Sequence, residues 1–254
     1  MHRVQLLANA QLAAGHVHLV LHAPMIARKA RPGQSLRLQA HPRKLFWCQL
    51  LIVNSEADSG MVEVLYRPED EASQMLAQRQ AGDFLHAQGP LGSSLLAHMQ
   101  RKWVMLLADS HGLAVMTYFA ERLYRLGGEY RPLLILEADL PLPFETCHSA
   151  TTLGLGGEGR LALALLESQG IDSSVADSSA SGRAQRWLAM RSPEQLAQVE
   201  LFVCARGCLL SRTRALAQGY KLPLQSLPVP AQLQTVIPHR DNTVQVYSAQ
   251  HPGR

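Results

Sequence analysis

The stretch WVMLLADSHGLAVMTYFAERL, Trp103–Leu123, decides the fold of the second half of the chain. It begins with a continuous apolar run, WVMLLA, which is typical of a strand covered on both faces of a parallel sheet. A helical apolar pattern follows from about His111 to Leu126 and ends at two glycines. A strand that leads directly into a helix is the beginning of an α/β unit.

The same alternation continues toward the C-terminus. Strands are predicted over 132–138, 186–190, 200–205 and 222–229, and helices over 161–169, 193–198 and 209–219. This order predicts a parallel, doubly wound sheet in an α/β domain. The Ser- and Gly-rich stretch 170–183 is expected to be a mobile surface loop.

The first hundred residues have a different pattern, in which short strands are separated by turn residues. In HVHLVLHA the apolar residues Val17, Leu19 and Leu21 share one face, and Val62 and Val64 share a face with Tyr66. Further strands are predicted over 34–40, 46–53 and 83–88, with a helix over 68–82. This pattern is typical of a small antiparallel barrel or sandwich.

Length and charge limit the possible functions. At 254 residues and 47% hydrophobic residues, the chain has room for two modest domains. The net charge of +4 comes from scattered Lys and Arg without interleaved aromatics, which argues against nucleic-acid binding. The first twenty residues fit neither a signal peptide nor a membrane span, so we expect a cytoplasmic protein.

Cysteines and histidines give no sign of a metal site or a disulfide framework. The four cysteines are widely scattered and none forms a C-x-x-C pair, so they are interpreted as buried thiols. His16, His18 and His22 have no acidic residue near them in sequence, which favours a solvent-facing strand edge over a metal site.

The order of these segments resembles a known family. The pieces RPGQSLRL, VEVLYR, GDFLHAQGPLG, LLADSHGLAVM, TTLGLGG and LFVCARGCLL, between Arg31 and Pro228, are similar to the ferredoxin-NADP reductase superfamily. Within it the sequence most resembles the electron-transfer subunit of dihydroorotate dehydrogenase. The resemblance implies a two-domain α/β protein: an antiparallel β-barrel that binds FAD in residues 1–100, an NAD(P)-binding-like domain in 101–238, and a tail in 239–254.

Carried over residue by residue, the flavin site matches in part. Lys44, Phe46 and Trp47 stand where the family has Arg, an aromatic residue and Ser, and lysine lacks the guanidinium fork that grips a pyrophosphate. Trp47 has no hydroxyl, and its indole either stacks on a flavin or fills the place of the ring. The other positions that the resemblance assigns to FAD are Tyr66, Arg67, Ser73, Gly89 and Gly92.

The nicotinamide site departs further from the family. The Gly-rich turn after the first α/β strand is ADSHG here, so only Gly112 remains to approach a phosphate, and Asp109 adds a negative charge. The family's Cys-Gly-Pro is Cys204-Ala-Arg, which keeps Cys204 as the one catalytic-site residue, or as a buried thiol that only packs. No cysteine follows Cys208, which excludes the family's iron–sulfur cluster.

Two functions follow from this comparison. In one, the chain is a flavin-dependent reductase-like component that holds FAD and passes electrons to another protein subunit, with NAD(P)H use disfavoured by the altered turn. In the other, it is a non-catalytic relative that uses the same body as a protein-docking or regulatory subunit.

Overall fold

The computed structural model describes residues 1–12, 15–41, 44–99, 101–109, 112–126, 130–137 and 180–227. The chain divides into two compact units, one containing Met1–Ser93 and the other Ser94–Val229. No helix in these described ranges is long and apolar enough to cross a membrane.

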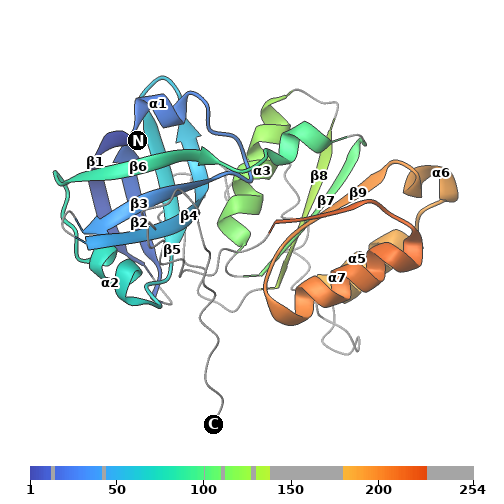
Figure 1. The fold of residues 1–254 in the computed structure, drawn as a ribbon. Coiled ribbons are helices and arrows are strands. Elements are labelled where there is room, and N and C mark those ends of the chain that lie inside the picture. Colours follow the sequence, from blue (N-terminus) through green and yellow to red (C-terminus); the bar gives the residue numbers. More distant parts are fainter. Residues whose placement is uncertain are drawn as a thin grey trace, which may run out of the picture. The chain divides into compact units, whose positions relative to one another are not determined.

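The first unit is a closed antiparallel barrel of six strands, in the order β1-β2-β5-β4-β3-β6 (Figure 1). Its strands are β1 (His2–Gln11), β2 (Val17–His22), β3 (Ser35–His41), β4 (Lys44–Glu56), β5 (Met61–Tyr66) and β6 (Phe84–Leu91). Two short helices, α1 (Pro24–Ala27) and α2 (Glu71–Ala77), lie in the connections. The predicted barrel is thus confirmed.

Alternating residues fill the barrel, because successive side chains of a strand point to opposite faces. Val17, Leu19 and Leu21 of β2 are buried, as the alternation predicts. Tyr66 of β5 is buried on the same inward face as Val62 and Val64.

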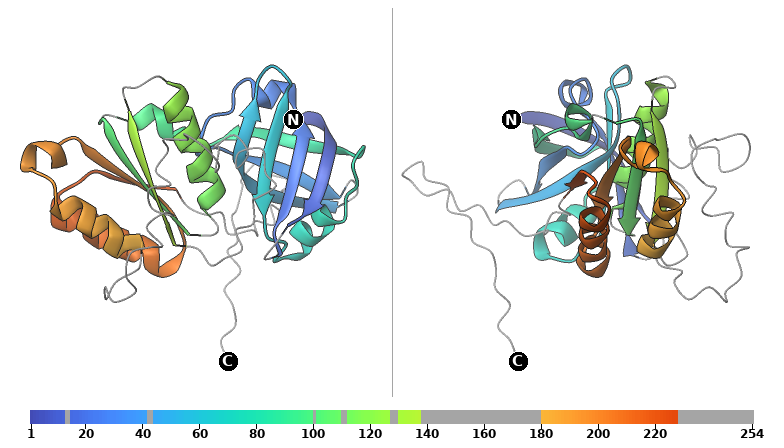
Figure 2. Two further views of the ribbon diagram at one scale, coloured as in Figure 1. Left: turned by 180° about the vertical axis from the view of Figure 1, so that it is seen from behind. Right: turned by 90° about the vertical axis from the view of Figure 1, so that its right-hand side faces the viewer.

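The second unit contains a parallel four-stranded sheet in the order β10-β9-β7-β8. Its elements are β7 (Trp103–Asp109), α3 (Leu113–Arg125), β8 (Arg131–Glu137), α5 (Ala180–Ala189), α6 (Pro193–Leu196), β9 (Val199–Cys204), α7 (Gly207–Tyr220) and β10 (Leu224–Ser226), preceded by the 3-10 helix η2 (Leu95–His98). Figures 1 and 2 show α3 on one face of the sheet and α5 and α7 on the other. This arrangement confirms the doubly wound prediction.

Both faces of β7 are covered, which explains its unbroken apolar run. Met105 and Leu107 belong to the core cluster formed with α5 and α7. On the side of α3, the rings of Phe119 and Phe202 pack edge to face, with their centroids 4.9 Å apart. Burial on both sides is the expected environment of a central parallel strand.

Some local predictions were wrong. Residues 186–190, predicted as a strand, lie in α5 and the turn after it, because Ala184 and Leu188 are buried one helical turn apart. The predicted loop 170–183 overlaps the start of α5, and β1 was not predicted as a strand. The predicted helix 161–169 and the glycines of TTLGLGG lie outside the described residues.

The histidine prediction was also wrong for two residues. His16 and His18 are buried, whereas His22 is exposed as expected. The Nε2 atom of His18 lies 2.8 Å from the Glu63 carboxylate, and the Asn54 side chain donates a second hydrogen bond to Glu63. The acidic partner was missed because the pairing of β2 with β5 brings it from a distant part of the chain.

Candidate functional site

In the described part of the parallel sheet, the order of the strands reverses next to β7. From β7 the chain passes outward to β8 and then returns to β9 on the other side of β7. Ligands of doubly wound folds bind beyond the carboxyl ends of the strands at such a switch point. Here that point lies at Asp109 and Cys204, the last residues of β7 and β9.

The carboxylate of Asp109 accepts backbone hydrogen bonds from both sides of this switch point. Its Oδ1 atom lies 3.0 Å from the amide nitrogen of Gly112, just before α3. Its Oδ2 atom lies 2.7 Å from the amide nitrogen of Arg206, the N-cap residue of α7. Amide groups at helix starts are the donors that hold phosphates in nucleotide-binding folds. In this chain the side chain of Asp109 accepts hydrogen bonds from two such amide groups.

Gly112 is required by the packing of the sheet. A Cβ atom at this position would lie 1.7 Å from the carbonyl oxygen of Cys204 and 2.7 Å from its Cβ atom. The backbone turn after β7 therefore presses directly against the end of β9. Gly112 and Cys204 were both predicted to face a nicotinamide, and in the structure they pack against each other.

Cys204 is fully buried. Burial, and to a smaller extent the charge of Asp109, raises the pKa of its thiol from 9.0 to about 12, and the charge of Arg206 opposes the rise. The thiol is therefore neutral at physiological pH and offers no thiolate nucleophile. Its expected role beside a nicotinamide stays a prediction.

A second internal carboxylate lies at the start of α2 in the barrel unit. The Oδ1 atom of Asp70 accepts a hydrogen bond of 2.7 Å from the amide of Ser73, and the Ser73 hydroxyl lies 3.0 Å from the Asp70 amide. The two residues thus form a reciprocal capping box. Ser73, which the family resemblance assigns to a phosphate, is buried and has its hydroxyl engaged by Asp70.

Asp70 also faces a buried pair of acidic groups. Burial, with a smaller contribution from the charge of Asp70, raises the pKa of the Cys48 thiol from 9.0 to about 12. Burial also raises the pKa of the Tyr66 hydroxyl above its ordinary value, and the charges of Cys48 and Asp70 raise it further. The Tyr66 hydroxyl and the Oδ2 atom of Asp70 are buried and have no hydrogen-bond partner among the described residues. Buried polar atoms without partners are uncommon and indicate a place for a water or a ligand.

The other predicted flavin residues lie along β4 and just after β5. Phe46 and Trp47 are partly buried in β4, and the side chain of Lys44 lies outside the described part of the structure. Arg67, directly after β5, is exposed. These positions keep the order that the family resemblance implies, and their roles toward FAD stay predictions.

Gly89 and Gly92 shape the end of β6. Gly89 packs against Leu36, whose Cβ atom would lie 3.0 Å from an added Cβ atom, and it precedes a cis peptide bond to Pro90. Gly92 has a φ of 84°, which favours glycine, and its carbonyl accepts a hydrogen bond from Gln34. The local packing and backbone conformation therefore explain why glycine occupies both positions.

Asp70 and Asp109 were not among the predicted site residues. The spacing of Asp70 and Ser73, D-x-x-S before a helical run, is a capping signal that could have been recognised. The charge of Asp109 was noted in the sequence, but its hydrogen bond to Arg206 depends on the adjacency of β7 and β9. Among the described residues no group of three or more His, Cys, Asp or Glu side chains could hold a metal ion.

Comparison with solved structures places this geometry in a fold family. Neither a known protein-family profile nor a curated protein sequence matches the chain. The ferredoxin reductase in carbazole 1,9a-dioxygenase matches with a TM-score of 0.66 and 15% identity, covering 90% of this chain and 69% of that one. The fold is that of ferredoxin-NADP reductase-like flavoprotein reductases.

Other structures with the reductase fold match similarly. Phthalate dioxygenase reductase gives a TM-score of 0.64 at 14% identity, with 89% of this chain and 67% of that chain covered. A flavohemoglobin from Malassezia yamatoensis with bound FAD and heme gives 0.62 at 13% identity, with 89% and 59% covered. At this identity the likeness concerns the fold alone, and the nearer resemblance to the dihydroorotate dehydrogenase subunit stays a prediction.

Proposed function

We propose that the chain is a non-catalytic relative of flavin-dependent reductases that serves as a protein-docking or regulatory subunit. One observation carries the proposal: carboxylates of the chain itself take the backbone N–H groups at which the reductase fold would receive phosphates. Asp109 does so at the switch point and Asp70 at the start of α2.

The residues around α2 do not fit the pyrophosphate of FAD. A diphosphate at the start of α2 would meet the carboxylate of Asp70. Like charges this close repel, and the repulsion is strongest where burial lowers the dielectric constant. Arg67 is the one predicted phosphate cation whose side chain the structure describes, and it is exposed.

The residues at the switch point do not fit a nicotinamide dinucleotide either. A pyrophosphate there would have to displace the Asp109 carboxylate from the amides of Gly112 and Arg206. Displacement would break both hydrogen bonds of the carboxylate, and a hydrogen bond to a charged acceptor contributes about 1.5–3 kcal/mol. The displaced carboxylate would still repel the incoming phosphate. The proposal therefore includes no NAD(P)H oxidation.

The test is direct measurement of nucleotide binding. We expect a colourless purified protein, and we expect FAD, NADH and NADPH to leave its thermal unfolding midpoint unchanged, because a ligand that binds only the folded state raises that midpoint. Release of about one flavin per chain on denaturation would refute the proposal.

A matched pair of variants tests whether charge is the reason. Asp70→Asn keeps an effective helix cap and removes the carboxylate charge, so it should gain measurable affinity for FAD. Glu71→Gln removes a charge one residue away on an exposed side chain and should gain none. Equal behaviour of the two variants would show that Asp70 does not exclude the cofactor.

A second candidate function, a flavin-holding electron-transfer component, is favoured by Tyr66. Its buried hydroxyl has no hydrogen-bond partner, and a bound ring system with an acceptor atom would satisfy it. If flavin binds, Lys44→Ala and Arg67→Ala should each weaken its retention. Unchanged retention in both variants would remove these two residues from the cofactor site.

A further inference from the structure

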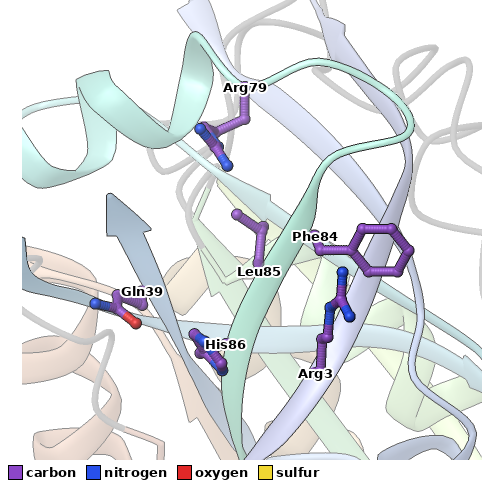
Figure 3. A pocket seen from close by; sticks show the side chains of 6 residues that line it. All are labelled: Arg3, Gln39, Arg79, Phe84, Leu85 and His86. Carbon is purple, nitrogen blue, oxygen red and sulfur yellow. The ribbon is translucent and has the colours of Figure 1, made fainter. Parts of the chain in front are cut away.

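The barrel unit has a pocket that involves none of the predicted site residues. It has a volume of about 210 Å³ and is lined by Arg3, Gln39, Arg79, Phe84, Leu85 and His86 (Figure 3). These residues come from β1, β3, β6 and the segment after α2. Arg3 and His86 are direct partners in the pairing of β1 with β6.

The pocket is cationic. None of the six described residues that line it is acidic, and no described carboxylate forms an ion pair with Arg3. The guanidinium of Arg3 instead lies 4.0 Å from the centroid of the Phe84 ring. Figure 3 shows these two side chains next to each other. Arg79 is paired with Asp83 at 3.2 Å, which leaves Arg3 and the exposed His86 to face an incoming anion.

Apolar surface adjoins the charged groups. Phe84 is 51% exposed, and Leu7, on the neighbouring strand β1, is 41% exposed. Arginine and aromatic side chains are the residues that most often dominate binding energy in protein interfaces. An arginine held against an exposed aromatic ring is thus ordered for binding before any partner arrives.

The size of the pocket indicates what it holds. Pockets for whole drug-sized ligands or cofactors measure about 300–1,000 Å³, and this one is smaller. It suits one acidic side chain, with an apolar neighbour of that side chain resting on the exposed ring.

We propose that this pocket docks an acidic segment of a partner protein, in which a Glu or Asp lies beside an apolar residue. Arg3 and His86 bind the carboxylate, and Phe84 and Leu7 contact the apolar side chain. The proposal rests on the docking function inferred above for the existence of a partner, and on the pocket's own charge for the kind of segment it takes.

The experiment uses the full chain and two short peptides at low salt. The acetylated peptide EELEE should shift the imidazole resonances of His86 saturably in NMR spectra, whereas QQLQQ, which has the same length without charge, should not. Arg3→Gln should weaken EELEE binding by about tenfold or more, because charge-assisted pairs to arginine are the stronger hydrogen bonds. Arg28→Gln, an exposed arginine of the same unit away from the pocket, is the matched control and should bind as wild type does.

Three outcomes would overturn the docking proposal. These are the absence of any EELEE binding, an equal loss in the Arg3→Gln and Arg28→Gln variants, and displacement of the peptide by an equal concentration of inorganic phosphate. The last result would identify a small-anion pocket instead. Flavin binding is measured separately, so a yellow protein that still binds EELEE would refute the non-catalytic function and leave this pocket assigned.

Discussion

Replacing Gly112 by alanine should destabilise the α/β unit severely, without any nucleotide present. The new Cβ atom would lie 1.7 Å from the carbonyl oxygen of Cys204, so the turn after β7 and the end of β9 must separate by roughly 1.3 Å to reach even a 3.0 Å contact. Overpacking of this kind costs about 1–3 kcal/mol. Loss of the Gly112 hydrogen bond to the charged Asp109 adds about 1.5–3 kcal/mol. We therefore expect the free energy of unfolding to fall by about 2.5–6 kcal/mol, a large part of the 5–15 kcal/mol typical of a domain.

Urea unfolding followed by tryptophan fluorescence measures this loss, since Trp103 and Trp187 both lie in the α/β unit. The matched control is Gly219→Ala in α7, where an added Cβ atom has nothing within 4 Å. This control should be neutral or stabilise by up to about 1 kcal/mol, because alanine is the better helix former. If Gly112→Ala unfolds within about 1 kcal/mol of wild type at an unchanged urea dependence, the close contact with Cys204 is not real.

Four further predictions concern Asp109, Ser73 and the thiols. Asp109→Asn should lower the unfolding free energy by about 1.5–3 kcal/mol, because its amide NH2 would face one of the two backbone N–H groups; a neutral result in urea unfolding would contradict the double hydrogen bond. Ser73→Ala should cost about 1 kcal/mol through loss of the capping box, measured in the same way, and an unchanged midpoint would show that the hydroxyl has no structural role. Burial raises the pKa of Cys48 and Cys204 from 9.0 to about 12, so the folded chain keeps both thiols neutral while the unfolded chain ionises them. The unfolding free energy should therefore fall as the pH rises from about 9 toward 12, and less steeply in Cys204→Ala; parallel pH profiles would contradict the shift. At pH 8 a thiol reagent should label one site fewer in Cys208→Ser than in wild type and the same number in Cys48→Ser, because Cys208 is exposed.

The fold was largely readable because each unit carries its own periodicity. Alternating residues in β2 and β5 predicted the barrel interior, and the unbroken run of β7 predicted a covered strand. The errors fall where local pattern is ambiguous. The segment 186–190 is a short apolar run that is compatible with either a helix or a strand. The sequence of β1 signals a strand only weakly, and its pairing with β2 and β6 stabilises the strand structure.

The candidate site was predictable by position and less so by role. Gly112 lies just after β7 and Cys204 ends β9, where the sequence pattern placed them, and their roles toward a nicotinamide stay predictions. No sequence pattern shows that Gly112 packs against the backbone of Cys204. Ser73 was assigned to a phosphate because the family resemblance places a hydroxyl there, whereas the bond to Asp70 depends on the local helix start. Sequence indicates which residues lie near a ligand position more reliably than it indicates which group occupies that position.

The carboxylate of Asp109 has a consequence for how this protein persists in a cell. A group tethered to the chain competes with free phosphate at the high effective concentration that covalent attachment provides. The α/β unit thus carries its own permanent acceptor for the N–H groups of Gly112 and Arg206. The unfolding midpoint of this unit should therefore not respond to added phosphate or NADH, which would stabilise a unit whose two N–H groups were open.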